Sequence, residues 1–264
     1  MEGPSLFLAQ EQLTEFIGKT VLSVEGNTKI GKERLVGKKV LDIFSWGKHL
    51  VFQFDDFAIR IHFLLFGTYE ATVNGVSVTG DYKRTKETRL TLNFENGDMK
   101  MFNCSIKIIE GAAVKETYDF TIDIMSPKWN AKAALTHMLE HSKEEISDVL
   151  LDQTVFSGVG NIIKNEVLSI VKVNPKQPII TIPEKKAKEI IKEAHAFSHQ
   201  FYEWRKLFEL KQHLQIHRKT SCPHCGTKII REKTGKRDRW AYYCPVCQHS
   251  CSYTPRINTT SSPQ

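Results

Sequence analysis

The sequence predicts an α+β protein of two domains, in which a strand-rich N-terminal domain precedes a helical one. Three observations predict this arrangement. Short runs of β-branched and aromatic residues occupy residues 20–110, helical spacing begins near residue 131, and four cysteines gather within residues 222–247. A chain of 264 residues is long enough to give each of two domains its own hydrophobic core.

We expect residues 1–122 to form a β-sandwich or a barrel-like sheet. Two dipeptides, Asp55-Asp56 and Asn96-Gly97, are plausible hairpin turns. Four runs near them mix β-branched with aromatic residues and are bounded by turn signals, namely residues 21–24, 50–54, 58–61 and 90–94.

One helix is predicted ahead of the sheet. Leu6, Leu13, Phe16 and Ile17 recur at near-helical spacing, which indicates an apolar face. Gly18 stands where such a helix would end. The helix therefore packs its apolar face on the sheet.

The pattern changes near residues 126–129, and we predict a linker at residues 123–130 and a helical domain at residues 131–217. Its expected helices are separated by Gly or Pro and cover residues 131–139, 147–151, 161–171 and 183–210. The last 13 residues, 252–264, are rich in Thr, Ser and Pro and are expected to be a disordered tail.

The charge balance favours an anionic partner. Lys and Arg number 37 against 30 Asp and Glu, a formal net charge of +7, so nucleic acid is the first candidate partner. A basic protein without such a partner is the alternative. No apolar run is long enough to span a membrane, and the N-terminus lacks a signal core, so we expect a cytoplasmic, DNA-associated protein and no membrane partner.

The cysteine spacing predicts a metal site. Cys-Pro-His-Cys is followed after 18 residues by Cys-Pro-Val-Cys, and two such pairs supply four thiolates at the corners of a tetrahedron. Two redox pairs are the alternative. His249 and Cys251 are near, but the site needs neither, and Cys104 is most simply a buried thiol. We expect one structural Zn²⁺, without an open coordination position, on Cys222, Cys225, Cys244 and Cys247.

Residues 218–251 are therefore predicted to form a zinc finger built on a β-hairpin. Strand-like flanks surround a basic turn, whose cations suit phosphate groups, although a finger of this kind also serves protein contacts. The four cations of the turn are Lys233, Lys236, Arg237 and Arg239.

Three further stretches carry a resemblance. They are Glu2-Gly3-Pro4 at the N-terminus, the Gly47-Lys48 turn within residues 46–50, and the run LLDQTVFSGVGNI at residues 150–162. Together with Arg239, five residues before Cys244, they resemble the family of bacterial formamidopyrimidine-DNA glycosylases and endonuclease VIII, and are closer to the endonuclease VIII branch. The third stretch resembles the helix-two-turns-helix signature of that family.

The resemblance implies a DNA glycosylase of base-excision repair with AP lyase activity, working as a monomer on damaged double-stranded DNA. An oxidised base would be removed through a Schiff base on the N-terminal amine. The residues that match the catalytic positions are Met1, Glu2 and Lys48.

The same resemblance implies residues that bind DNA. Leu65, with Leu64 or Phe66, would fill the space that the extruded base leaves, whereas a buried strand continuing from residue 61 is the alternative. Asn161 would bind phosphate with the amides of the glycine turn before it, or would cap a helix. Lys48 and Arg239 would grip phosphates, or be ordinary surface cations.

The sequence departs from the family pattern at its start. Met1 occupies the place of the catalytic proline, and the bulky Glu2 that follows disfavours its removal. An α-amino group has a pKa of about 7.7 to 8.0, against about 10.4 for lysine, so Met1 remains a usable nucleophile. Ser5 replaces a second glutamate, and residues 103–108 lack an insertion of the formamidopyrimidine branch, which favours oxidised pyrimidines as substrates.

Two other functions compete with this interpretation. Without the proline, the same fold would serve as a non-catalytic protein that binds damaged DNA or abasic sites. A zinc-ribbon regulator that reads DNA sequence is a third, more distant possibility, and it predicts affinity for an undamaged site that survives the addition of competitor DNA.

Overall fold

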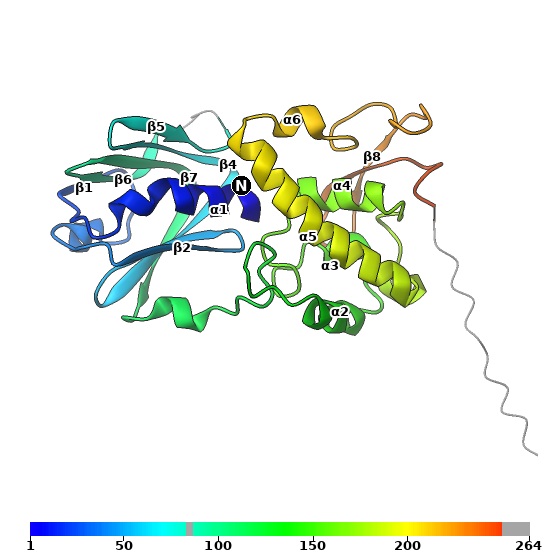
Figure 1. Cartoon of the computed structure of the whole chain (residues 1–264), viewed down its shortest axis with the longest axis horizontal. Coiled ribbons are helices and arrows are strands. Elements are labelled where there is room, and N and C mark those ends of the chain that lie inside the picture. Colours follow the sequence, from blue (N-terminus) through cyan, green and yellow to red (C-terminus); the bar gives the residue numbers. More distant parts are fainter. Residues whose placement is uncertain (83–86, 250–264) are drawn as a thin grey trace, which may run out of the picture.

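The protein is described by a computed structural model, which covers residues 1–82 and 87–249 in the detail used below. A sheet-rich half, formed by the N-terminal part of the chain, lies beside a helical half (Figure 1). The predicted zinc-finger boundary at residue 251 and the predicted tail at residues 252–264 lie outside the described residues.

The sheet-rich half contains one antiparallel sheet of seven strands within the described residues, in the order β1-β6-β7-β4-β3-β2, with β5 paired to β4. The strands are β1 Ser23–Glu25, β2 Asp42–Trp46, β3 His49–Gln53, β4 Phe57–Val73, β5 Val76–Thr79, β6 Thr88–Phe94 and β7 Gly97–Glu110.

This sheet folds over on itself. Ile43 of β2 and Leu92 of β6 lie toward opposite ends of the strand order, yet both belong to a single buried cluster. The long strands β4 and β7 run through both layers and interrupt their pairing between Phe63 and Thr68. The predicted β-sandwich is thus confirmed, built from one bent sheet.

Helix α1, Gly3–Leu13, precedes the sheet and continues into η1, Thr14–Phe16. Leu6, Leu13 and Phe16 are fully buried, as predicted, whereas Ile17 is 38% exposed. Gly18 adopts a left-handed backbone with φ +83, a conformation that favours glycine and ends the helical segment.

The helical half contains α2 Ala131–Glu140, α3 Ile146–Val149, α4 Asn161–Ile170, α5 Glu184–Lys206 and α6 Leu210–His213, and the chain also forms η2 Lys32–Leu35, η3 Val114–Thr117 and η4 Ile179–Thr181. A second buried cluster, which includes Phe156, Ile163 and Ile190, holds these helices together. Helix α5 ends earlier than predicted, because Phe208 enters the left-handed region with φ 59. None of the described helices has the length and apolarity that crossing a bilayer requires.

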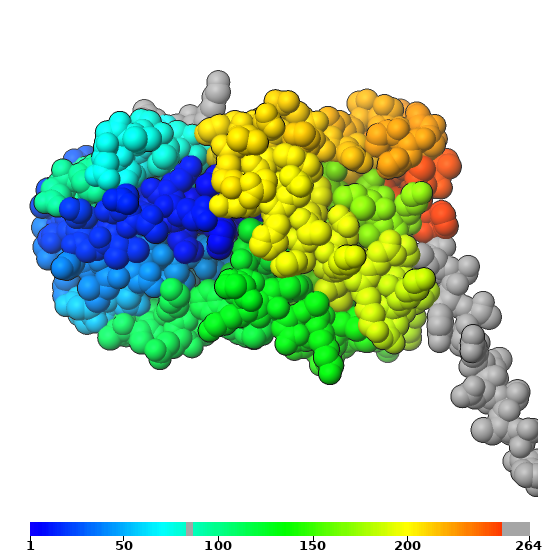
Figure 2. All heavy atoms as spheres, viewed as in Figure 1, coloured from blue at the N-terminus to red at the C-terminus, as the bar shows by residue number. Residues whose placement is uncertain are grey.

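The cysteine-rich segment forms the predicted hairpin. Strands β8, Ile230–Thr234, and β9, Arg239–Tyr243, pair antiparallel and begin and end between the two cysteine pairs. The hairpin packs on α4 through β9. In the space-filling view the finger lies at the end of the molecule farthest from the sheet (Figure 2).

The two halves contact each other through α1 and α5. The Tyr202 hydroxyl of α5 donates to the Glu11 carboxylate of α1 at 2.6 Å, and the ring of Tyr202 lies edge-on to Phe7 with centroids 5.4 Å apart. Helix α5 therefore bridges the sheet and the helical half (Figure 1).

Candidate functional site

Three segments meet where the two halves join: the N-terminus, the β2–β3 turn and the loop before α4. The Gly3 amide donates to the Gly158 carbonyl at 2.8 Å. A Cβ atom on Gly3 would lie 2.8 Å from the Gly158 Cα, and one on Gly47 would lie 2.0 Å from the Ser157 Oγ. Glycine is required at position 3 because the two backbones approach too closely for a side chain, and at position 47 the left-handed φ of +52 favours it as well.

The carboxylate of Glu2 lies at the N-terminus of α4. It accepts hydrogen bonds from the amides of Gly160 at 3.1 Å, Ile162 at 2.7 Å and Ile163 at 3.3 Å. The first residues of a helix have amides without intrahelical partners, and a carboxylate satisfies them. Glu2 thus caps a helix of the other half of the molecule, which fixes the start of the chain over the junction.

The amine of Met1 and the carboxyl of Glu2 are shifted in opposite directions. Burial lowers the pKa of the Met1 amine below its ordinary value, although Asp81 and Glu2 oppose the shift. Burial raises the pKa of Glu2, against the opposing effects of Lys48 and the α4 amides. The site therefore holds an amine that deprotonates easily beside a carboxyl group that holds a proton easily.

Lys48 lies half-buried in the β2–β3 turn. Burial lowers the pKa of its ammonium group to about 8, the Glu2 carboxylate opposes the shift, and the charge of Arg239 adds to it. Its carbonyl oxygen contacts the Nδ1 atom of His62 at 3.1 Å. Lys48 is therefore not an ordinary surface cation.

Residues 64–66 form an exposed apolar bulge. Leu64, Leu65 and Phe66 are 44%, 65% and 45% exposed, and Phe66 adopts φ 62. The alternative of a buried strand continuing beyond Phe63 is therefore wrong. The Asn103 side chain donates to the Leu65 carbonyl at 2.5 Å and holds the bulge in place.

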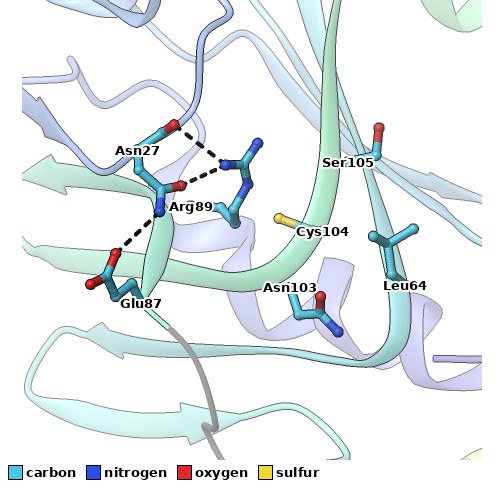
Figure 3. A pocket seen from close by; sticks show the side chains of 7 residues that line it. All are labelled: Asn27, Leu64, Glu87, Arg89, Asn103, Cys104 and Ser105. Atoms are coloured by element: carbon cyan, nitrogen blue, oxygen red, sulfur yellow. Dashed lines mark hydrogen bonds between the residues drawn. The ribbon is translucent and has the colours of Figure 1, made fainter.

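A pocket of about 570 Å³ opens beside this bulge, between Leu64 and the start of β6 (Figure 3). One guanidinium nitrogen of Arg89 donates to the Asn27 side chain at 2.6 Å, and Asn27 in turn contacts Glu87. Cys104 is buried in the wall, as predicted. The lining residues are Asn27, Leu64, Glu87, Arg89, Asn103, Cys104 and Ser105.

The structure places Asn161 at the first turn of α4, but not as its N-cap, which is Gly160. The capping alternative is therefore wrong. The amides of Gly158 and Gly160, which were expected to help bind phosphate, have internal partners in this structure: Gly158 donates to Gln153 at 3.1 Å and Gly160 donates to Glu2. The Asn161 Oδ1 atom is buried and has no hydrogen-bond partner among the described residues.

The finger tip carries fewer unpaired cations than predicted. Lys233 pairs with Asp238, Arg237 pairs with Asp152 at 2.6 Å, and Lys236 lies 3.6 Å from Glu144. Arg239 makes no ion pair within the part of the chain that the structure describes. Of the four cations predicted at the finger tip, Arg239 is thus the one that pairs with no carboxylate among the described residues.

Sequence reasoning missed the polar residues that hold the finger. Lys164, Asn165 and Glu166 are fully buried on α4. The Lys164 ammonium donates to the Trp240 carbonyl at 3.1 Å, and the Asn165 carbonyl oxygen accepts from the Tyr242 amide at 3.3 Å. The available signal was three consecutive polar residues, Lys-Asn-Glu, inside an apolar helix.

Glu166 secures the segment that leads into the finger. Its carboxylate accepts three backbone hydrogen bonds, from Gln215 at 2.9 Å, Ile216 at 3.0 Å and His217 at 2.7 Å. Asp148 accepts in the same way from the Lys236 amide at 2.6 Å at the hairpin tip. These contacts orient the hairpin, and hence Arg239, relative to α4.

The four predicted cysteine ligands form a cluster. Their sulfur atoms all lie within 4.8 Å of one another, and the separations include 3.5 Å between Cys225 and Cys244 and 3.8 Å between Cys222 and Cys247. A tetrahedral ion with metal–sulfur bonds of about 2.3 Å would place its ligands roughly 3.8 Å apart. The cluster therefore fits one four-coordinate metal ion.

Comparisons with known proteins agree with this architecture. Residues 123–200 match the family model described as the formamidopyrimidine-DNA glycosylase H2TH domain. "Endonuclease 8-like 3" of Mus musculus is 28% identical over 76% of this chain and 33% of its own length. "Formamidopyrimidine-DNA glycosylase" of Lactobacillus johnsonii is 28% identical over 94% of this chain and 98% of its own.

Among solved structures, a Lactococcus lactis formamidopyrimidine-DNA glycosylase bound non-covalently to DNA with an AP site has a TM-score of 0.79 and 24% identity, covering 95% of this chain and 100% of its own. This likeness shows the fold. The chain spans about a third of the length of the first of the curated relatives. The matched helical segment, the relatives and the shared fold together show that the chain belongs to the formamidopyrimidine-DNA glycosylase and endonuclease VIII family.

Proposed function

We propose that the protein is a DNA glycosylase of base-excision repair with AP lyase activity, which removes an oxidised base from double-stranded DNA through a Schiff base on the Met1 amine. The observation that carries the proposal is the meeting of that amine with Glu2 and Lys48 at the junction of the two halves. Relatives named as glycosylases and endonucleases support it.

The first step brings the damaged nucleotide out of the duplex. A base inside the stack cannot be reached by the amine, so the nucleotide is extruded and the gap is filled. The exposed bulge at Leu65, with Leu64 and Phe66, is suited to filling it, because an apolar side chain stacks between bases. Lys48, Asn161 and Arg239 contact the backbone phosphates around the extruded nucleotide.

Excision follows by nucleophilic attack. The Met1 nitrogen bonds to C1′ of the sugar, and the bond from C1′ to the base breaks with its electron pair leaving on the base; the nitrogen loses one proton, and the departing base gains one. The lowered pKa of the amine supplies more of the free base at neutral pH. Glu2, whose pKa is raised, delivers a proton to the ring oxygen O4′, so that the sugar ring opens to the imine. Elimination of the phosphates then nicks the strand.

Oxidised pyrimidines are the proposed substrates. Residues 103–108 run directly along β7 without an inserted loop, which leaves the space beside Leu64 open. We propose that the protein acts as a monomer, since the amine, Glu2, Lys48 and Arg239 all come from one chain.

The cysteine cluster is proposed to hold one Zn²⁺. Four thiolates leave the ion without an open position, so it stabilises the finger and takes no part in the chemistry. The ion would hold the two ends of the hairpin together, while α4 packs against strand β9. Both contacts would fix the position of Arg239, the first residue of β9.

Strand cleavage tests the proposal. The purified protein, shown by intact mass to begin with unmodified Met1, is incubated with a duplex containing an oxidised pyrimidine and with one containing an abasic site. The proposal expects cleavage of both. Tight binding of the abasic duplex without cleavage would instead establish a non-catalytic damage-binding protein, the function that the missing proline favours.

A further inference from the structure

We propose that Tyr82 is a positioning residue for the apolar bulge at residues 64–66. Its ring holds Phe66, and the ion pair of the neighbouring Asp81 with Arg205 ties the segment to α5, so that the bulge is already in place when DNA arrives. The inference rests on the proposed function and deepens it, because it concerns how the gap left by the extruded base is filled.

The bulge receives little support from the sheet. The pairing of β4 with β7 stops at Phe63 and resumes at Thr68, so residues 64–67 have no partner in that ladder. Phe66 also adopts φ 62, a left-handed conformation that is unfavourable for a bulky side chain and persists only where neighbouring groups hold it. The ring of Phe66 therefore needs support from outside this ladder.

Tyr82 gives that support. Its ring lies edge-on to the ring of Phe66, with the centroids 5.5 Å apart and the ring planes at 87°. Aromatic pairs prefer this geometry, in which the positive edge of one ring meets the negative face of the other. Phe66 is still 45% exposed, so the contact holds the ring without removing it from the surface that would meet DNA.

The segment that leads to Tyr82 is fixed by the helical half. The Asp81 Oδ1 atom accepts from the Nε atom of Arg205 at 2.5 Å, and the Arg205 Nη2 atom donates to the Thr79 carbonyl at 3.0 Å. The side chains of Arg205 and Asp81 are only 7% and 15% exposed. Hydrogen bonds from a guanidinium group to a carboxylate are strong and directional. Arg205 of α5 thus holds the chain directly before Tyr82.

The same segment is also packed against β4. The Gly80 amide donates to the Tyr69 carbonyl at 2.9 Å. A Cβ atom on Gly80 would lie 2.6 Å from the Thr68 Oγ1 atom, so a side chain at this position would push the segment away from β4. Thr68 and Tyr69 are the residues at which β4 resumes its pairing after the bulge. The chain before Tyr82 is therefore tied both to α5 and to the point where the bulge ends.

These contacts give the bulge a fixed position before DNA binds. An apolar side chain that is already held in place loses little conformational freedom when it enters the base stack, whereas a loose one must be ordered at that moment. Removal of the Tyr82 ring should therefore weaken extrusion of the nucleotide and filling of the gap. Bond formation at C1′ uses Met1 and Glu2, and it should proceed unchanged once the sugar is accessible.

The test compares two substrates of the full chain. The first is a duplex with an oxidised pyrimidine, which must be extruded, and the second is a single-stranded oligonucleotide with an abasic site, in which no base pair has to be opened. Tyr82→Ala is expected to lower single-turnover excision from the duplex about tenfold and to leave cleavage of the single strand unchanged. Tyr82→Phe, which keeps the ring, should retain the wild-type ratio of the two rates. Asp81→Ala, which removes the tie to Arg205, should lower this ratio as Tyr82→Ala does.

Tyr202→Ala serves as the matched control. It removes an edge-on contact of nearly the same geometry, with Phe7 at 5.4 Å and 81°, from the same helix that carries Arg205. Tyr202 is not part of the path from Arg205 to Phe66, so the ratio of the two rates should keep its wild-type value. Thermal unfolding confirms that each variant folds.

Extrusion is also measured directly, with a fluorescent purine analogue placed beside the lesion, whose emission rises when its neighbour leaves the stack. Wild-type protein that cleaves neither DNA overturns the proposed function, and the fluorescence then still decides the inference, because Tyr82→Ala should reduce the rise. A wild-type ratio in Tyr82→Ala or in Asp81→Ala, with an unreduced rise in fluorescence, overturns the inference alone. An equal loss on both substrates also overturns it, because a merely structural role has that signature.

Discussion

At the scale of single residues, Glu2 combines two tasks. Its carboxylate caps α4 through three backbone amides, and it lies beside the amine and the ammonium group that the proposed reaction uses. The sequence identified Glu2 as a candidate catalytic residue through its place in Glu2-Gly3-Pro4. It did not reveal the cap, because the amides that Glu2 contacts are about 160 positions away along the chain.

Glu2→Gln separates the two tasks. The amide oxygen still accepts on one side of the α4 N-terminus, but the amide nitrogen cannot accept on the other side, and no proton can be delivered to O4′. We expect excision to fall at least about 100-fold, with a loss of stability of about 1 to 3 kcal/mol, because the charge leaves the helix N-terminus and a backbone donor loses its acceptor. Single-turnover excision and thermal unfolding measure the two effects, and a variant with wild-type excision would remove Glu2 from the proposed chemistry.

The effect of Lys48 on the stability of the fold is predicted to depend on pH. Its folded pKa of about 8 lies below the ordinary value of 10.5, so the unfolded chain binds more protons between these values. The charged, buried ammonium therefore costs stability below about pH 8, and this cost disappears as the pH rises toward 10.5.

Lys48→Met should accordingly be more stable than the wild type at pH 7, by about 1 to 3 kcal/mol, and the difference should shrink between pH 8 and 10.5. Excision should decrease in the same variant. Urea unfolding at several pH values measures the difference in free energy of unfolding. A difference that stayed constant between pH 8 and 10.5 would contradict the cost of burying the charged ammonium group.

At the scale of elements, α4 carries more of the site than its sequence pattern indicates. Periodicity predicted the helix, because Ile163 and Val167 lie on one apolar face. The same periodicity could not predict that Lys164, Asn165 and Glu166 are buried by the finger, since burial by a distant segment leaves no local signal. The hairpin and its cysteines were predictable because both depend on short-range spacing.

Glu166→Gln tests the support of the finger. The variant leaves a buried amide nitrogen facing backbone donors, which should cost about 2 to 4 kcal/mol and weaken DNA binding. Glu189→Gln on α5, where the carboxylate is exposed, should change both stability and DNA binding by little. Equal effects of the two variants on unfolding would contradict the structural role of Glu166.

Removal of the metal is a second test of how the finger is held. We expect one zinc ion per chain, lost with a strong chelator or in Cys244→Ser, and a DNA affinity at least about tenfold lower, because Arg239 is no longer held. Metal analysis and a binding titration measure both. Full affinity in metal-free protein would show that the finger does not position a DNA contact.

At the scale of the whole molecule, the site exists only where the two halves meet. The Gly3–Gly158 contact, the Glu2 cap and the Asp81–Arg205 pair each join segments that are far apart in the sequence. Residue types and motifs identified Met1, Glu2, Lys48 and Arg239 as candidates. They did not reveal the pairing of Asp81 with Arg205, because a lone aspartate after a strand has no distinguishing pattern before the fold brings α5 beside it.

The central claim concerns the nitrogen that bonds to the sugar. Borohydride trapping on abasic-site DNA, followed by proteolysis and mass spectrometry of the DNA-linked peptide, identifies that nitrogen directly. The account predicts a single adduct on the α-amino group of Met1. An adduct on the side chain of Lys48, or no adduct with an unblocked Met1, would contradict it.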